Sequence, residues 1–387
     1  MSWKEGLERQ GATGQQGGSE IERPSAPIGA PGEPARAPHL WRNRMLQAGV
    51  ALLVLGAAGF GLLNDPGEDP ASTPRMQAPS VTAHAQHRLH PDTSRRLTNG
   101  CRYSMRGIPQ CGALLGAAYG SNTSVLGWEG ELGHTLGIHR TYYAPDRVTQ
   151  AVAQAREDVA HGRIPWMSFK LPHSWKAMAA GEGDGWVRDI ADRLAKLDGP
   201  VWVAFHHEPE NDGPMYEWTE MQHRLAPLVH RVAPNVAYTI ILTGYNQIYG
   251  APWLSLDAIW PRDTDIDLIG FDVYNDFGVR REDGSRDTSP TDLGAQYFVH
   301  FEDFAKRYGV PWAVSETGIT DEFAASHPHW IRHTYQELIE HHGVAMSYFN
   351  SSLHSTGSWP LDGGKEADFA DTLSGSPTLE PPSKPSP

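Results

Sequence analysis

The chain has 387 residues, of which 39% are hydrophobic, and a formal net charge of −14 at pH 7. This length can bury a full-size core and leaves room for one domain of roughly 250 residues plus appendages. The negative charge would repel phosphate backbones, so composition argues against nucleic acid as a partner and favours a neutral or weakly charged substrate.

The N-terminal part of the chain lacks the pattern of a folded domain. Residues 1–44 are rich in Gly, Pro, Gln and charge and show no apolar periodicity, so we expect a disordered cytoplasmic tail. Residues 45–63 contain no charged side chain and are long enough to cross a bilayer as one helix. Arg42 and Arg44 precede this run and acidic residues follow it, which predicts a membrane anchor with everything after residue 64 outside the cell. A cleaved signal peptide, and hence a secreted protein, is the alternative.

Two further segments and a cysteine pair flank the expected body. Residues 64–98, rich in Pro, Ser and Ala, read as a flexible linker, and residues 374–387 as a disordered tail. Cys101 and Cys111 are the only two cysteines and lie on the side of the anchor expected to be exported. A small disulfide loop before the first strand is therefore predicted, with two free thiols as the alternative.

From residue 112 onward, short runs rich in β-branched and aromatic residues alternate with longer amphipathic stretches that close on glycine. Strands that are apolar along their length and separated by helices form a parallel sheet, and eight such units predict a closed (β/α)8 barrel over residues 99–373. An open doubly wound sheet is the alternative, but the residues after the first run, AAYGSNTS, lack the Gly-rich phosphate-binding patterns. The predicted strands are residues 113–120, 136–143, 164–170, 201–207, 236–244, 267–274, 311–318 and 343–350.

Two glutamates stand out at the ends of predicted strands, where the chemistry of such a barrel gathers. Glu208 follows the fourth strand and Glu316 ends the seventh, so both are expected on one rim. Two carboxyls that face each other can cleave a glycosidic bond: one protonates the leaving oxygen and the other attacks the anomeric carbon. Asp272 and Tyr274 end the sixth strand and are placed to reach the same mouth, where the tyrosine could donate to the nucleophile. The alternative for each glutamate is a surface salt bridge.

Aromatic side chains near the strand ends are candidates for stacking on sugar faces. Trp175 follows the third strand, Trp218 follows Glu208 and Trp359 follows the eighth strand. Core packing explains each of them equally well. His207 could hold a sugar hydroxyl, and Lys170 brings a cation to the end of the third strand.

No cofactor or metal is predicted. The stretch HHEPE lacks the His-Glu-x-x-His spacing of a zinc protease, and no G-x-S-x-G elbow of a serine hydrolase occurs. A non-catalytic carbohydrate-binding or cell-envelope protein on a similar barrel is the rival from another class.

Three stretches resemble, in the same order, segments of glycoside hydrolase family 26, within clan A of the retaining β-glycosidases. VWVAFHHEPEND resembles the acid/base segment, and it has His before Glu where most of the clan has Asn. AIWPRDTDIDLIGFDVYND resembles the sixth-strand segment, and PWAVSETGI resembles the nucleophile segment. The resemblance covers about residues 112 to 360 and implies the same barrel fold.

By that resemblance Glu208 is the general acid/base, Glu316 the nucleophile, His207 a substrate contact and Tyr274 the partner of Glu316. It implies an endo-type enzyme acting on a β-linked polysaccharide, with β-mannan favoured and mixed-linkage glucan or β-1,3-xylan as the substrates of some members. The chain departs from the family at the end of the third strand, where Phe169-Lys170 replaces the Trp-His of many members. A cation there changes what the sugar pocket accepts.

Overall fold

The structure is a computed structural model that describes residues 95–281, 283–353 and 355–380. The expected tail at 1–44, the expected membrane segment at 45–63 and nearly all of the expected linker lie outside the described residues. Within the described part of the chain, no helix has the length and apolar composition needed to span a bilayer.

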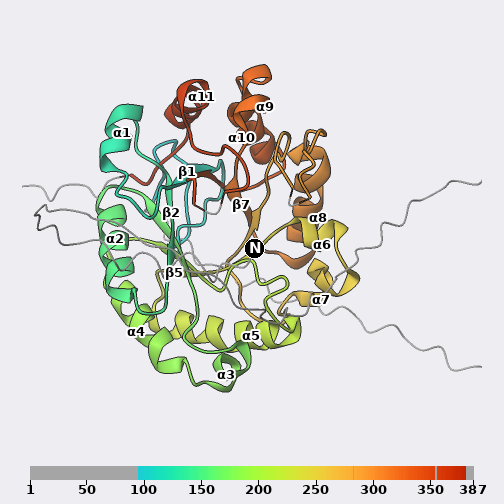
Figure 1. Cartoon of the computed structure of the whole chain (residues 1–387). Coiled ribbons are helices and arrows are strands. Elements are labelled where there is room, and N and C mark those ends of the chain that lie inside the picture. The colour runs from blue at the N-terminus through green and yellow to red at the C-terminus, as the bar shows by residue number, and fades with distance from the viewer. Residues whose placement is uncertain (1–94, 282, 354, 381–387) are drawn as a thin grey trace, which may run out of the picture. The chain divides into compact units, whose positions relative to one another are not determined.

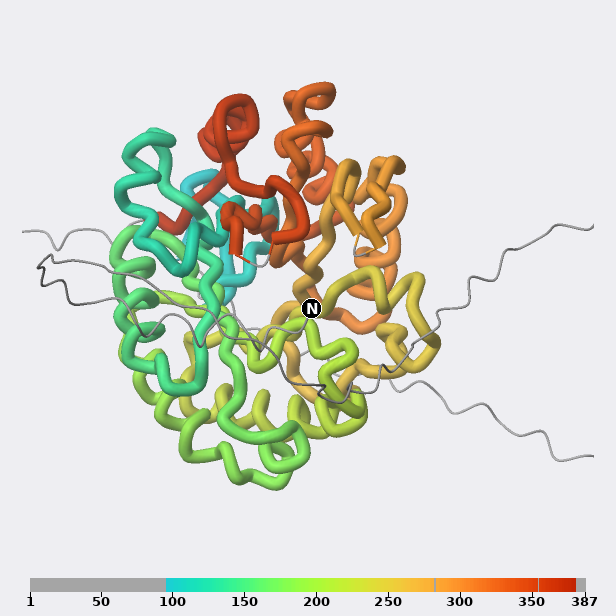
Figure 2. The backbone as a smooth tube through the Cα atoms, in the orientation of Figure 1, coloured from blue at the N-terminus to red at the C-terminus, as the bar shows by residue number. Residues whose placement is uncertain are grey.

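Eight parallel strands close into a barrel, with each strand paired to the next and β8 paired to β1 (Figure 1). The closed (β/α)8 barrel predicted from the sequence is confirmed, and the open doubly wound sheet is excluded. In Figure 2 the first and last parts of the barrel, cyan and red, lie side by side where the sheet closes. The strands are β1 (Leu114–Tyr119), β2 (Ile138–Tyr143), β3 (Ile164–Phe169), β4 (Val201–Phe205), β5 (Val236–Leu242), β6 (Leu268–Asp272), β7 (Trp312–Thr317) and β8 (Ala345–Asn350).

Helices surround the strands, and the longer ones pack on them through an apolar face. In α4, for example, Val187, Ile190, Ala191 and Leu194 are buried, which is the spacing of one helical face. The α-helices are α1 (Leu126–Leu132), α2 (Val148–Ala160), α3 (Trp175–Ala180), α4 (Asp184–Leu194), α5 (Met215–Val232), α6 (Tyr245–Tyr249), α7 (Leu256–Ile259), α8 (Val299–Tyr308), α9 (Asp321–Ser326), α10 (Trp330–Glu340) and α11 (Gly363–Ser374). A 3₁₀ turn, η3 (Pro252–Leu254), joins α6 to α7, and a π-helical turn, η4 (Gly294–Phe298), leads into α8.

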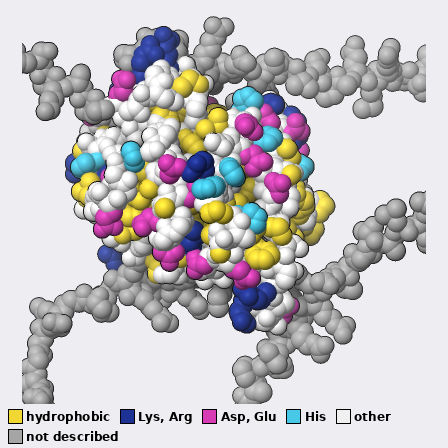
Figure 3. Space-filling view, turned by 90° about the horizontal axis from the view of Figure 1, so that it is seen from above, with side chains coloured by type: hydrophobic (Ala, Val, Ile, Leu, Met, Phe, Trp, Pro, Cys, Tyr) yellow, Lys and Arg dark blue, Asp and Glu magenta, His cyan; other side chains and the backbone are white. Residues whose placement is uncertain are grey.

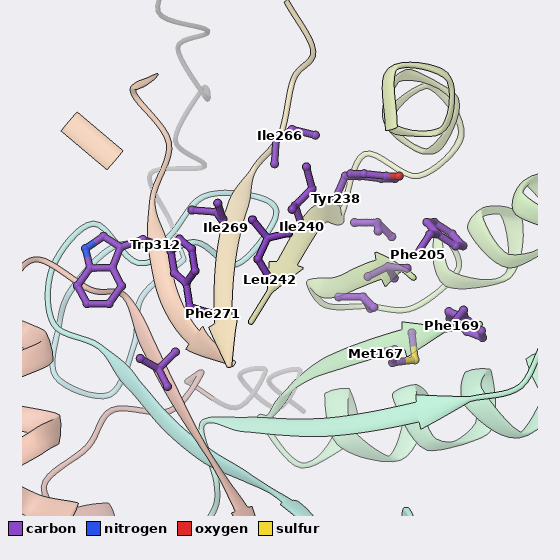
Figure 4. Close-up of a cluster of buried hydrophobic side chains, with 14 of the residues drawn as sticks. Met167, Phe169, Phe205, Tyr238, Ile240, Leu242, Ile266, Ile269, Phe271 and Trp312 are labelled. Carbon is purple, nitrogen blue, oxygen red and sulfur yellow. The ribbon is translucent and has the colours of Figure 1, made fainter. Parts of the chain in front are cut away.

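The strands separate two apolar layers, because successive side chains point to opposite faces of a strand. The larger layer lies between strands and helices; Figure 4 shows Phe169, Phe205 and Tyr238 from three neighbouring strands in it. The smaller layer fills the barrel interior and contains Trp166 and Trp202, whose rings meet edge to face at 5.1 Å. The barrel interior is therefore a packed core and leaves no room for a ligand between the strands.

The chain before β1 closes the end of the barrel where the strands begin. Leu97 is fully buried and packs with the first residues of the strands, and Trp202 Nε1 donates to the carbonyl of Arg106 at 2.9 Å. A disulfide joins Cys101 to Cys111 within this cap, with the Cα atoms 5.5 Å apart. Since one end of the barrel is covered, the carboxyl ends of the strands form the open rim.

Two sequence-based boundaries are wrong by a few residues. Leu97, placed in the linker, belongs to the cap, and Leu379, placed in the disordered tail, is buried and pairs with it in an antiparallel bridge. The physical reason is that both leucines complete the apolar floor of the barrel, which composition alone does not reveal. The folded body therefore extends to both sides of residues 99–373.

Candidate active site

Glu316 ends β7 and receives hydrogen bonds from two tyrosines. The Tyr142 hydroxyl donates to its Oε1 at 2.7 Å, and the Tyr274 hydroxyl donates to its Oε2 at 2.8 Å. Burial, followed by the negative charge of Glu316, raises the pKa of both phenols well above the usual range, so both remain protonated donors. Two fixed donors are what an ionised carboxylate needs in a partly dry site.

A buried cation adds to this environment. Arg140, on β2, is fully buried, with its guanidinium 3.6 Å from Glu316 Oε1 and 4.4 Å from the centre of the Tyr142 ring. Its Nη1 donates to Ser168 Oγ at 2.7 Å. A buried positive charge is costly unless an acidic group lies close to it, and Glu316 is that neighbour. Two phenol donors and one guanidinium therefore surround the Glu316 carboxyl.

Glu208, in contrast to Glu316, lies in an environment that favours the protonated carboxyl. Burial, and then the negative charges of Glu316 and Glu210, raise its pKa from 4.5 to about 8. The influence of Glu316 on this pKa places the two carboxyls within electrostatic reach of each other. Glu208 therefore keeps its proton near neutrality and can act as a general acid.

The turn that presents Glu208 has an unusual backbone. His206 and Glu208 both have positive φ, 59° and 48°, which side chains other than glycine adopt rarely. The turn is tied to the barrel because the His206 amide donates to the Phe169 carbonyl at 2.9 Å and the Glu208 amide to the Ile241 carbonyl at 3.0 Å. The His206 ring also lies 3.0 Å from Asp212. Strain of this sort persists only where the surroundings hold it, and it is common at active sites.

Asp272 lies beside the two glutamates. It ends β6 directly opposite Glu316, at a register shift between the two strands, and Ser315 Oγ donates to its Oδ1 at 2.5 Å. Burial, followed by the charges of Glu316 and Glu208, raises its pKa well above the usual range. Three carboxyls thus share one low-dielectric region, and only Glu316 has two tyrosines and a guanidinium beside it.

His207 is buried next to these groups. Its ring centre lies 5.5 Å from that of Tyr142. Burial, followed by the charge of Arg140, lowers its pKa well below 6.5, so the imidazole is neutral. A neutral imidazole both donates and accepts, which suits contact with a sugar hydroxyl.

A cleft of about 590 Å³ opens beside Glu208 at the ends of β3, β4 and β5. Its lining includes Lys170, Trp175, His207, Glu208 and Asn246. A second hollow of the same volume lies near α1 and the C-terminal segment, away from these carboxyls, and is lined by Gly130, His134 and Ser376 among others. The cleft at the strand ends, which contains Glu208, is therefore the candidate substrate-binding site.

The three tryptophans predicted to stack on sugars have different surroundings. Trp218 is only 1% exposed and its Nε1 donates to the His206 carbonyl at 3.2 Å, so it packs α5 and supports the turn instead of offering a face to a ligand. Trp359 is also buried and lies 5.1 Å from the Tyr274 ring, which it helps to position. Trp175 is buried, meets the His206 ring edge to face at 4.9 Å and lines the cleft. The prediction was wrong for Trp218 because the α5 sequence does not show which helical face is buried.

Two residues that contact Glu316 were given no role in the site from the sequence: Arg140, recognised only as a polar residue near the end of the second strand, and Tyr142. Arg140 and Tyr142 lie two positions apart on β2 and so point to the same face, into the barrel mouth. The signal was present in the run LGIHRTYY, where three consecutive polar residues, His139 to Thr141, interrupt an otherwise apolar strand. It could be interpreted only once the opposite strand, β7, was known to face it.

Metal-ligating and basic side chains bear on two other classes of function, metal binding and nucleic-acid binding. Among the described residues, no group of three or more His, Cys, Asp or Glu side chains could hold a metal ion. On the face seen in Figure 3, basic side chains occur in separate small groups among acidic, histidine and hydrophobic ones. That face offers no continuous basic surface for a phosphate backbone.

No family model matches the sequence, and no curated protein sequence matches it. Solved structures match in fold. A cellulose synthase subunit Z from Clostridioides difficile is 15% identical over 67% of this chain and 99% of its own, with a TM-score of 0.50. A GH26 β-mannanase from Bacteroides ovatus is 17% identical over 68% of this chain and 88% of its own, with a TM-score of 0.47. Cel5A from Thermotoga maritima, solved with mannotriose, is 14% identical over 67% of this chain and 96% of its own, with a TM-score of 0.48.

At these identities the comparisons show similarity of fold alone. The cellulose synthase subunit, with a TM-score of 0.50, agrees with this chain in fold. The function has to be argued from the side chains of the site.

Proposed function

We propose that the chain is a retaining β-glycosidase in which Glu208 is the general acid/base and Glu316 the nucleophile. The observation that carries the proposal is the contrast between two neighbouring carboxyls. Glu316 is held by two phenol donors and the Arg140 guanidinium, whereas burial and nearby negative charge raise the pKa of Glu208 to about 8. One acid that keeps its proton and one carboxylate that stays charged are the two parts that such a reaction needs.

The proposed reaction has two steps. Glu208 donates its proton to the departing glycosidic oxygen while Glu316 attacks the anomeric carbon and forms a glycosyl ester. Glu208, now ionised, takes a proton from water, which cleaves the ester and releases the sugar with net retention of configuration. Tyr142 and Tyr274 hold Glu316 in place, and His207 contacts a sugar hydroxyl near the reacting centre.

The finer assignment rests on the sequence resemblance. We propose an endo-type enzyme acting on a β-linked polysaccharide, with β-mannan as the favoured substrate. We also propose that residues 45–63 anchor it in the membrane with the barrel outside the cell, or that it is secreted. The disulfide between Cys101 and Cys111 supports an oxidising compartment.

The test measures hydrolysis of an aryl β-mannobioside by the full chain and by Glu316→Ala, Glu208→Ala and Glu220→Ala variants. Glu220 is an exposed glutamate on α5 and serves as the matched control. Loss of Glu316 should abolish turnover, while added azide should restore cleavage and yield an α-glycosyl azide. Loss of Glu208 should slow cleavage by ~10²–10⁴-fold with a poor leaving group and far less with a dinitrophenyl one, which needs no proton. Hydrolysis unchanged in both variants would refute the assignment.

A non-catalytic carbohydrate-binding protein on the same barrel gives a different result. The wild type would then bind mannan, xylan or mixed-linkage glucan without hydrolysing any of them. Product analysis of a wild-type digest by NMR also tests the stereochemistry, since the first-formed anomer must be β.

A further inference from the structure

The exposed aromatic side chains of the molecule gather in one sector. Within the described residues, the aromatic side chains that stand out into solvent are Tyr216, Tyr245, Tyr249 and Trp253, which are 69%, 57%, 48% and 71% exposed. All of them lie in the segments that follow β4 and β5. Large rings left this exposed on one side of a protein commonly mark a binding surface. We refer to these four residues as the aromatic strip.

Tyr249 fixes the central part of the strip through contacts on both sides. Tyr245 and Tyr249 are one turn apart on α6, and their ring centres are 5.7 Å apart. The Tyr249 hydroxyl donates to the Gln296 carbonyl at 2.8 Å, and its ring meets that of Tyr297 edge to face. Trp253 follows in η3, at the same four-residue interval. Rings fixed before binding lose little conformational entropy when a ligand arrives.

The strip also continues from the cleft that contains Glu208. Asn246 lines that cleft, and Tyr245 is its neighbour on α6. Glu217 lines it as well, with Tyr216 directly before it. The strip therefore adjoins the cleft that contains Glu208 and extends along α6 and η3, the yellow elements of Figure 1.

We propose that the aromatic strip binds successive sugar rings of a linear β-glycan that extends from Glu208 past Tyr245 toward Trp253. The ligand class follows from the chemistry, because flat rings with a polar edge suit the apolar face of a neutral pyranose and its hydroxyls. The consequence is that a polymer gains contacts with Trp253 that a glycoside confined to the cleft does not make. This inference rests on the proposed function.

The experiment compares the full chain with the variants Trp253→Ala and Tyr245→Ala. The control is Met105→Ala, because Met105 is 43% exposed and belongs to the cap at the other end of the barrel. Two substrates are used for each variant, a soluble glucomannan and an aryl β-mannobioside, and circular dichroism checks folding. We expect kcat/KM on the polymer to fall roughly tenfold per variant and that on the aryl substrate to stay within about twofold. Met105→Ala should match the wild type on both.

Binding is measured separately in a Glu316→Ala background by affinity electrophoresis in glucomannan, lichenan and xylan gels. If at least one polymer retards the protein and adding Trp253→Ala removes that retardation, glycan binding by the aromatic strip is supported, even where the wild type hydrolyses nothing. Glycan binding by the strip and catalysis by Glu208 and Glu316 can therefore fail independently. Equal loss of activity on polymer and aryl substrate, no change on either, or no retardation by any polymer would overturn the inference. So would Trp253-dependent binding to phosphatidylglycerol vesicles without glycan binding.

Discussion

Replacing Glu208 by glutamine should stabilise the protein while it destroys the proposed acid. Burial and neighbouring carboxylates raise the pKa of Glu208 from 4.5 to about 8 in the folded state. Between these two pH values the unfolded chain has released a proton that the folded chain still binds. Folding stability therefore falls as the pH rises through this window, and the full cost is present above the folded-state pKa.

The size of the effect follows from the same shift. Each pH unit above 4.5 costs about 1.4 kcal/mol until the folded-state pKa is reached, which gives a ceiling of about 3 kcal/mol at pH 7. Because Glu208 borders an open cleft, solvent screening reduces this, and we expect a gain of about 1–3 kcal/mol for Glu208→Gln at pH 7. The gain should shrink toward zero at about pH 4, where both states of the wild type are protonated.

Urea unfolding of the wild type, Glu208→Gln and the exposed control Glu220→Gln at several pH values measures this directly. The difference between wild type and Glu208→Gln should widen with pH, whereas Glu220→Gln should follow the wild type. A Glu208→Gln protein that is less stable than the wild type at pH 7, or a difference that does not depend on pH, would refute the reasoning about the environment of Glu208.

Three further results are expected. Since Glu208 must be protonated to act as the acid, kcat/KM of the wild type should fall as the pH rises through about 8, and a profile flat to higher pH would argue against this assignment. Tyr274→Phe removes one hydrogen-bond donor to Glu316 and should lower kcat on an aryl β-mannobioside by ~10–100-fold, with little change in the free energy of unfolding. An unchanged kcat would show that this hydrogen bond has no catalytic role. The double variant Cys101→Ala, Cys111→Ala opens a short loop in the cap and should lose about 2–3 kcal/mol of stability in thermal unfolding. Its KM should equal that of the wild type, and an altered KM would contradict the placement of the cap away from the site.

The fold could be predicted from the sequence because each barrel strand is buried on both faces. Runs such as VWVAF and VAYTIIL are apolar along their whole length, and that pattern recurs at regular intervals between helices. Glu208 and Glu316 could be found for a related reason, since a carboxyl at the end of a buried run is out of place unless something uses it.

What could not be predicted depends on contacts across the barrel. Tyr142 and Glu316 are far apart in sequence and meet only because the sheet closes. Leu97 and Leu379 likewise meet at the floor, although each lies in a stretch whose composition resembles a linker or a tail. Local patterns report the environment of one strand or helix, and they do not report which residues lie opposite.

The turn after β4 shows how local preference and function conflict in this chain. His206 and Glu208 adopt positive φ, which their side chains disfavour, and no local sequence preference accounts for it. The cost is met by tertiary contacts: the Trp218 indole donates to the His206 carbonyl, and the His206 ring lies against both Trp175 and Asp212. These contacts fix the backbone that carries Glu208, so Trp218, which lines no part of the cleft, supports the position of Glu208 through the turn.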